Sequence, residues 1–128
     1  MTPLRFRAWH TAEKKLGWVT GLSFAANGIL MVGVKWNDGS IGMYSPDEVI
    51  LMQSTGLKDK NGVEIFEGDV IQDGDELTNY EVLWEDDCAC FGGWNKDGWI
   101  GMPDLMQCEV IGNIYQNPEL LKPAESGN

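Results

Sequence analysis

The chain has 128 residues, 43% of them hydrophobic and 23% charged, which is the size and composition of a globular domain with its own core. Twenty acidic and nine basic residues give a net charge of −11, which argues against a protein that binds duplex phosphates. The apolar runs are too short for a transmembrane helix, and the N-terminus lacks an apolar signal-peptide core. A cytoplasmic location is therefore expected.

The first half of the chain is expected to form a β-meander. Leu4–Trp9 alternates with period two, and Leu16–Phe24 is rich in β-forming residues. Asn27-Gly28 and Asn37-Asp38-Gly39 predict turns, because Asn, Asp and Gly tolerate positive φ. Further strands are expected between these two turns and after the second one.

A short helix is predicted at the end of this half. Ser45 can cap a helix, Pro46 suits the first helical position, and Glu48 lies where a capping box needs it. The apolar stretch Val49–Met52 that follows permits one or two turns. Residues 1–53 are therefore expected to form an N-terminal β-rich segment that ends in a short helix.

Tight turns dominate the second half. Asn61-Gly62 lies between two β-forming segments and predicts a hairpin, and Glu67-Gly68-Asp69 predicts the next turn. Asn95-Lys96-Asp97-Gly98 predicts another one. Short strands separated by Gly-rich turns at regular spacing indicate a β-barrel or a β-sandwich.

The C-terminal end is predicted to hold one more strand and a helical turn. The strand is expected over Cys108–Tyr115, with Gly112 at a bulge or bend. Asn117-Pro118-Glu119 can begin a final helical turn, and residues 122–128 resemble a frayed tail. Residues 117–128 are therefore expected to form a short helical turn and a flexible tail.

Three cysteines, Cys88, Cys90 and Cys108, are expected to be reduced thiols. Their number is odd, whereas small secreted scaffolds usually carry an even set. Cys88 and Cys90 have C-x-C spacing, and His10 lies far away in the sequence. This spacing does not support a Cys₃His zinc site.

Three separated motifs resemble the YopX family of phage and prophage proteins. Leu51–Ile71 looks like the family signature, Glu109–Leu120 is similar to its C-terminal motif, and Arg5–Trp9 resembles its start. His10 departs from the acidic residue common at that position. The resemblance implies a mainly β protein, with an SH3-like barrel over residues 54–116 after the N-terminal segment. It implies no activity.

The residues shared with the family have structural explanations. Those that suit turns and side-chain-to-backbone bonds within turns are Gly56, Asp59, Asn61, Gly62, Gly68 and Asp69. Apart from the family, the strand pattern of residues 54–116 leads us to expect seven mostly buried side chains there: Leu57, Ile65, Val70, Val82, Trp84, Ile111 and Ile114. Phe66 and Tyr115 also suit core positions.

Two acidic clusters are candidate cation sites: Asp73, Asp75 and Glu76, and Glu85, Asp86 and Asp87. Neither has the spacing of an EF-hand loop, and acidic turns of this kind are usually solvated. With a single histidine, the chain lacks the usual base of a nucleophilic triad. We therefore predict no catalytic residue, no cofactor and no metal.

The candidate interaction surface comprises Arg5, Arg7, Trp94 and Trp99. The two arginines lie on the basic N-terminal strand, which could pair as an edge strand with a neighbouring chain. The two tryptophans flank a predicted loop tip, where an exposed ring suits protein or sugar contacts. The alternative for most tryptophans is that they fill a small core.

Three functions stay open. The preferred one is a non-enzymatic phage or prophage accessory protein that acts through protein–protein contacts or self-assembly as a homo-oligomer. The first alternative is a small-barrel nucleic-acid-binding protein, which the net charge disfavours. The least favoured is a metal-dependent hydrolase or nuclease that uses acidic residues. Fold analogy does not decide among them.

Overall fold

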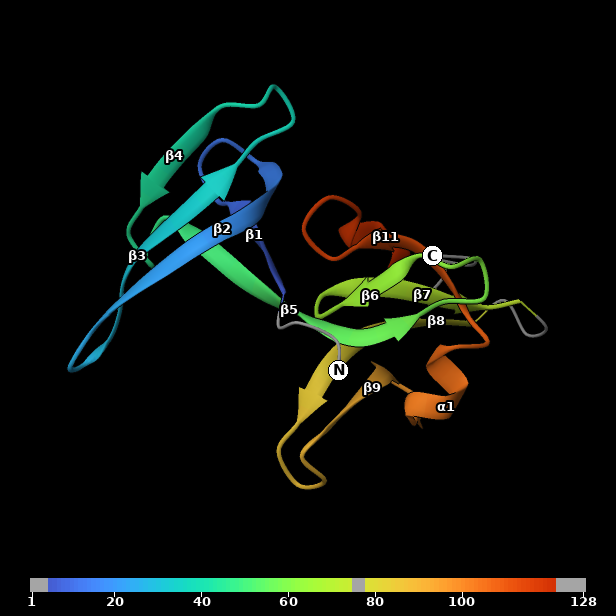
Figure 1. Cartoon of the computed structure of the whole chain (residues 1–128). Helices are drawn as coiled ribbons and strands as arrows, with labels where there is room; N and C mark the ends of the chain where they lie inside the picture. Colours follow the sequence, from blue (N-terminus) through green and yellow to red (C-terminus); the bar gives the residue numbers. More distant parts are fainter. Residues whose placement is uncertain (1–4, 75–77, 122–128) are drawn as a thin grey trace. The chain divides into compact units, whose positions relative to one another are not determined.

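The computed structural model describes residues 5–74 and 78–121 (Figure 1). The described residues form mainly β-structure in two antiparallel sheets, as expected from the sequence. The chain divides into two compact units, Met1–Ser54 and Thr55–Asn128, which we call unit 1 and unit 2. No helix among the described residues is long and apolar enough to cross a membrane.

The first sheet contains six strands in the order β4-β3-β2-β1-β5-β6. They are β1 (Phe6–His10), β2 (Lys15–Ala25), β3 (Gly28–Lys35), β4 (Ile41–Tyr44), β5 (Val49–Lys58) and β6 (Glu64–Phe66). Strand β1 pairs with β2 on one side and with β5 on the other. The hypothesis that this strand is an open edge for a neighbouring chain is therefore wrong, because its own chain occupies both sides.

The helix expected after Ser45 is a single turn followed by a strand. The capping contact itself is present: the Ser45 backbone N–H donates to Glu48 Oε1 over 2.9 Å. The Glu48 N–H also donates to the Ser45 carbonyl oxygen over 3.0 Å. Strand β5 nevertheless begins at Val49, which pairs with His10 of β1. The β-branched Val49 and Ile50 favour the strand, and the pairing with β1 decides against the helix.

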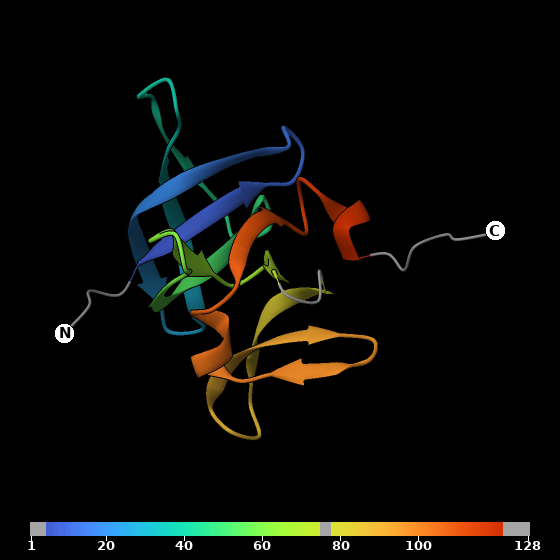
Figure 2. The same ribbon diagram turned by 90° about the vertical axis from the view of Figure 1, so that its right-hand side faces the viewer.

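The second sheet has five strands in the order β10-β9-β8-β7-β11. These are β7 (Asp69–Asp73), β8 (Thr78–Glu85), β9 (Cys90–Asn95), β10 (Gly98–Ile100) and β11 (Glu109–Asn113). The sheet is open within the described residues, because β10 and β11 are its two ends and do not pair with each other. The expected closed SH3-like barrel is not seen there. After β10 the chain turns into helix α1 (Met102–Leu105), which has a proline in its first turn and lies beside the orange β9–β10 hairpin in Figure 2.

Most turns and irregularities occur where the sequence predicts them. Gly62 and Gly68, with φ of 84° and 83°, lie in the turns before β6 and β7, and such values favour glycine. The register of β11 against β7 shifts between Val110 and Gly112, which is the expected bulge. A 3₁₀ turn spans Pro118–Leu121, as expected. The predicted tail, residues 122–128, lies outside the described residues.

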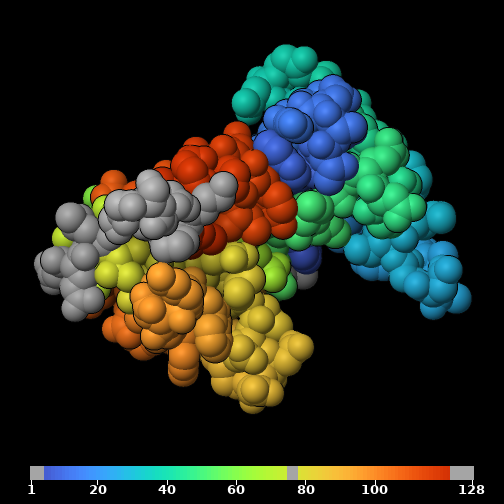
Figure 3. Space-filling view, turned by 180° about the vertical axis from the view of Figure 1, so that it is seen from behind, coloured from blue at the N-terminus to red at the C-terminus, as the bar shows by residue number. Residues whose placement is uncertain are grey.

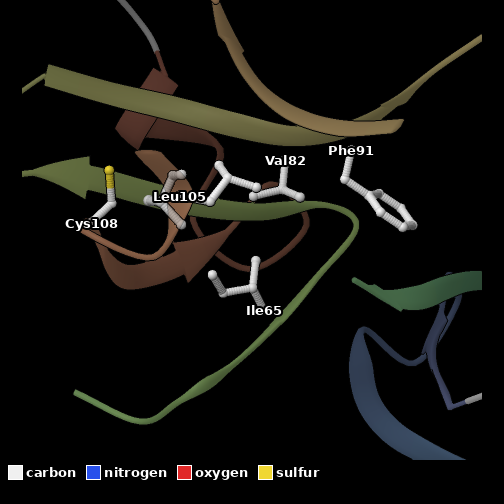
Figure 4. Packing of buried hydrophobic residues seen from close by; sticks show 6 residues of the cluster. Ile65, Val82, Phe91, Leu105 and Cys108 are labelled. Atoms are coloured by element: carbon white, nitrogen blue, oxygen red, sulfur yellow. The ribbon is translucent and has the colours of Figure 1, made fainter. Parts of the chain in front are cut away.

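Each unit has its own hydrophobic core. That of unit 1 contains Ala8, Val32, Val34, Trp36 and Val49. That of unit 2, shown in Figure 4, contains Ile65, Ile71, Val82, Phe91, Leu105 and Cys108. The unit 2 cluster combines residues of both sheets with Leu105 of helix α1 and with Cys108.

The predicted core of unit 2 is largely correct, with one error. Ile65, Val70 and Val82 are fully buried, whereas Leu57, Ile111 and Ile114 are only partly buried. Trp84 is 44% exposed, so the expectation that it is buried is wrong. It lies near the end of β8, where its ring contacts Phe91 edge-on at 4.9 Å between centroids.

Candidate functional site

The hairpin of β2 and β3 is longer than the strands beside it. β1 pairs with β2 only over residues 15–18, and β4 pairs with β3 only over residues 32–35. Residues Ser23–Met31 therefore pair only with one another among the described residues. We call this segment the arm. Its light-blue atoms project from unit 1 in Figure 3.

Two large apolar side chains of the arm are exposed. Phe24 has 67% and Leu30 has 56% of its surface accessible. Phe24 is the cross-strand partner of Ile29, and the register shifts between Ser23 and Phe24 so that Leu30 is an extra residue. An isolated two-stranded hairpin is marginally stable in water, and exposed apolar clusters mark interaction sites. The arm is thus the best candidate contact surface of unit 1.

The sheet at the base of the arm has exposed apolar side chains of its own, on the face opposite to the core of unit 1. Trp18 pairs with Lys35, and Lys35 pairs with Ile41, so the three side chains share one face. Trp18 is 47% and Ile41 63% exposed, and Met43 on the same strand is 60% exposed. Met43 packs against Gly33, where a Cβ would lie 3.3 Å from the methionine sulfur and 3.0 Å from Thr20 Oγ1. We call these three exposed side chains the base patch: Trp18, Ile41 and Met43.

A basic residue borders the base patch. The guanidinium of Arg5 lies over the Trp18 ring, 5.3 Å from its centroid, which is cation–π geometry. Both side chains line a shallow hollow of about 400 Å³ that continues along β2 from Val19 to Leu22. This part of unit 1 therefore combines aromatic surface with positive charge.

The four residues of the predicted interaction surface lie in different surroundings. Arg5 is exposed beside Trp18, whereas Arg7 is buried. Trp94 and Trp99 are cross-strand partners in unit 2 whose rings stack with centroids 5.7 Å apart. Trp99 is exposed and borders a hollow of about 380 Å³ beside Thr78, Asn95 and Asp97. A role of these residues in binding stays a prediction.

Asp59 and Asp69 of the turn motif bind backbone groups. Asp59 is buried, and its carboxylate accepts hydrogen bonds from the N–H groups of Asn61 and Val63 at 2.8 Å and of Val110 at 2.9 Å. Burial alone would raise the pKa of Asp59, but these three bonds and the nearby Lys60 charge lower it below its ordinary value. Asp69 accepts a bond from the Phe66 N–H at 2.8 Å. Both carboxylates hold the chain in place within unit 2.

A hollow of about 610 Å³ in unit 2 is lined by charged, polar and apolar residues. Its lining residues are Lys60, Asp73, Gly74, Tyr80, Ile100, Asp104, Gln107 and Cys108. Burial, together with the Asp73 and Asp104 charges, raises the pKa of the Cys108 thiol to about 11. The thiol is thus protonated near neutral pH and is a poor nucleophile.

The two acidic clusters are only partly described. Asp75 and Glu76 lie outside the described residues, while Glu85 is the last residue of β8 and Asp86 and Asp87 lie in the turn that follows. Within residues 5–74 and 78–121, no group of three or more His, Cys, Asp or Glu side chains is arranged to hold a metal ion.

Cys88 and Cys90 form a disulfide, so the expectation that all three cysteines are reduced is wrong. Cys108 is free and buried. The turn between β8 and β9 bends sharply at Ala89, whose φ of 51° lies in the left-handed region. This bend brings the two Cα atoms within 5.3 Å, which suits a disulfide. The C-x-C spacing was the only sequence signal, and the odd cysteine count obscured it.

Comparison with known proteins identifies the family. A family model described as YopX protein matches residues 5–122. The chain belongs to the YopX family. This YopX-family chain is also similar to the crystal structure of protein EF1440 from Enterococcus faecalis, with 31% sequence identity and a TM-score of 0.71. The match covers 95% of this chain and 100% of that one. No curated protein matches the chain significantly.

Proposed function

We propose that this YopX-family protein is a non-catalytic phage or prophage accessory protein that acts through protein–protein contacts, with a second copy of the chain as its partner. The phage setting follows from the family resemblance. The observation that carries the proposal is the arm, which exposes Phe24 and Leu30 on a hairpin segment that pairs only with itself among the described residues. The arm forms the proposed contact surface.

The charge distribution supports unit 1 as the contact surface between two copies. Residues 1–54 contain five basic and four acidic residues, a net charge of +1. Residues 55–128 contain four basic and sixteen acidic residues, a net charge of −12. Two copies that approach through unit 2 would repel each other, whereas contact through unit 1 avoids this repulsion.

The backbone of the arm supports the same partner. Each strand of the arm has one edge whose backbone groups are not used by the other strand, and such edges pair with further strands. A second arm can add in antiparallel orientation along one of these edges, which satisfies the backbone groups of that edge and brings the apolar side chains of the two arms next to each other. The same patch then serves both copies, so the contact has two-fold symmetry and closes as a dimer.

The surroundings of the chain's single histidine and of its free thiol support a non-catalytic role. His10 is buried, with its ring edge-on to Tyr44 at 5.1 Å and to Trp36 at 6.1 Å between centroids. Its Nδ1 accepts the Glu13 N–H over 3.0 Å, and its Nε2 lies 3.6 Å from the Glu13 carboxylate. The Cys108 thiol is protonated, as described above. His10 is buried, and the Cys108 thiol is both buried and protonated, so neither is exposed as a general base or nucleophile needs to be.

Sedimentation velocity of the full chain tests this proposal. We expect a dimer at micromolar concentration, and we expect the double variant Phe24→Ser/Leu30→Ser to be a folded monomer with an unchanged far-ultraviolet spectrum. Met106→Ser is the matched control, because Met106 is 50% exposed but lies in unit 2. It should leave the dimer intact. A native protein that stays monomeric would overturn the second copy as partner, and a dimer that survives the double substitution would overturn the arm as contact.

A further inference from the structure

The turn that connects β8 to β9 carries an accessible disulfide. Cys88 is exposed and Cys90 is half-buried at the start of β9. In Figure 3 the golden-yellow atoms of this turn project from the rest of unit 2. An attacking thiolate must approach a sulfur atom directly, and the exposed position of Cys88 permits that approach.

Two features indicate that this disulfide contributes little to the stability of the fold. The bond encloses a single intervening residue, and the stabilisation that a disulfide provides in the chain-entropy description grows with the length of the loop it closes. The enclosed residue, Ala89, has a φ of 51°, which is disfavoured for a side chain with a Cβ atom. The disulfide therefore encloses a conformation that costs free energy, which offsets part of any stability that the bond provides.

The reduced form also has local partners. The Glu85 carbonyl oxygen lies 3.8 Å from Cys88 Sγ, so the thiol formed on reduction has an acceptor at hand. The Ala89 N–H donates to the Asp86 carbonyl oxygen over 3.3 Å, and the Asp87 N–H donates to the Glu85 carboxylate over 3.3 Å. These bonds do not involve the disulfide, so the turn keeps its backbone contacts when the bond is broken.

We propose that Cys88 and Cys90 form a thiol–disulfide exchange site for low-molecular-weight thiols, with a preference for uncharged or cationic ones. A thiolate attacks Cys88 Sγ, a mixed disulfide forms, and the bond to Cys90 breaks to leave a Cys90 thiolate. A second thiolate then attacks the small-molecule sulfur of the mixed disulfide and releases the Cys88 thiolate. Two thiols are oxidised to one disulfide, the protein disulfide is reduced, and the two protons of the thiols pass to Cys88 and Cys90.

The preference for charge follows from the residues of the turn. Glu85, Asp86 and Asp87 directly precede Cys88, and Asp86 and Asp87 are exposed. Their negative charges repel an anionic thiol such as glutathione and attract a cationic one such as cysteamine. Salt screens interactions between exposed charges, so the preference should fall as ionic strength rises.

Equilibration of the native protein in glutathione redox buffers, followed by alkylation under denaturing conditions and mass spectrometry, tests the exchange. We expect one alkylated cysteine, Cys108, in oxidised buffer and three in millimolar reduced glutathione, reversibly. The melting temperature should change by no more than a few degrees on reduction, and Cys108→Ser should keep the two-thiol transition. Three alkylated cysteines in every buffer would overturn the proposal, as would a disulfide that resists reduction until the protein unfolds.

Rates of reduction test the preference independently of the proposed dimer. Each rate is divided by that of the same thiol with an uncharged small disulfide, which removes differences in thiol reactivity. At low salt we expect cysteamine to exceed glutathione by roughly tenfold, the lower end of electrostatic effects on association. The double variant Asp86→Asn/Asp87→Asn, or high salt, should reduce this ratio. A ratio near one in the native protein, or one that the double variant leaves unchanged, would refute the charge preference.

Discussion

Replacement of Asp59 by asparagine tests how a single carboxylate holds unit 2 together. Its Oδ1 accepts the N–H groups of Asn61 and Val63, and its Oδ2 accepts the N–H of Val110 across 51 residues of sequence. Asparagine has the same shape, so its oxygen can keep the first two bonds. Its amide nitrogen then faces the Val110 N–H, and two donors oppose each other.

The expected loss of stability follows from these three bonds. A hydrogen bond to a charged group contributes about 1.5–3 kcal/mol, and an unsatisfied buried donor loses a similar amount. Loss of the Val110 bond and weaker acceptance of the other two should lower the free energy of unfolding by about 3 kcal/mol in Asp59→Asn. Asp59→Ala should be only slightly worse, at about 4 kcal/mol, because Asn61 and Val63 are exposed and water can bind their N–H groups.

The pH dependence provides a second test of the same bonds. The pKa of Asp59 is lowered in the folded protein, so its contribution is complete above the unfolded pKa of about 4 and is lost as the pH falls through the folded pKa. The gap in stability between the native protein and Asp59→Asn should therefore persist at neutral pH. It should narrow below about pH 4.

Urea unfolding followed by tryptophan fluorescence measures these differences. Asp97→Asn is the control, because Asp97 is an exposed turn aspartate of the same unit and its change should lie within about 0.5 kcal/mol. If Asp59→Asn unfolds at the same urea concentration as the native protein, or if the gap between them widens in acid, the account of Asp59 given above is incorrect.

Three further substitutions test packing and charge in unit 2. Ile65→Ala should lower the free energy of unfolding in urea titrations by about 3 kcal/mol, because Ile65 is fully buried. Val63 lies in the same hairpin but is 48% exposed, so Val63→Ala should change this free energy little. Equal effects of the two substitutions would contradict the assignment of Ile65 to the core. Gly112→Ala should cost about 2 kcal/mol, since a Cβ would collide with the Asn117 side chain, and an unchanged midpoint would argue against that contact. Burial raises the pKa of Glu81, so Glu81→Gln should raise the melting temperature at neutral pH. This gain should vanish towards about pH 4, where the glutamate is protonated in both the folded and the unfolded protein. A gain that does not depend on pH would contradict the explanation by burial.

The elements that the sequence predicts well depend on short-range chemistry. Gly62 and Gly68 occupy turns because glycine adopts positive φ angles at little cost in free energy. This preference can be read from the sequence without knowledge of the fold. Ile65 and Val82 are buried because alternation assigns them to one face of a strand. The bulge beside Gly112 follows in the same way from the weakness of glycine within a strand.

The errors arise where distant segments decide the outcome. The cap at Ser45 forms as predicted, but β1 pairs with Val49 and the following residues and converts the expected helix into a strand. The open second sheet depends on which strand β11 selects as its partner, which local patterns do not specify. The disulfide of Cys88 with Cys90 depends on the left-handed conformation of Ala89, which alanine seldom adopts.

The arm was missed for a related reason. Phe24 and Leu30 are large apolar residues of the kind found in protein cores, and the alternation pattern alone assigns such side chains to the buried face of a sheet. Their exposure follows from the different lengths of neighbouring strands, because β1 and β4 end before the arm begins. A comparison of strand lengths along the predicted meander is the signal that could have found it.

The pairing of β11 with β7 also has a consequence for biosynthesis. β7 leaves the ribosome well before β11 is synthesised. Until then, Val70 and Ile71 of β7 lack the β11 partner strand with which they pair in the complete protein, where both are fully buried. During that interval β7 has one open edge that carries β-branched apolar residues, which is the kind of edge that other chains pair with. Chains that terminate prematurely before Glu109 should therefore aggregate or be degraded, whereas chains that terminate after Asn113 can complete the sheet.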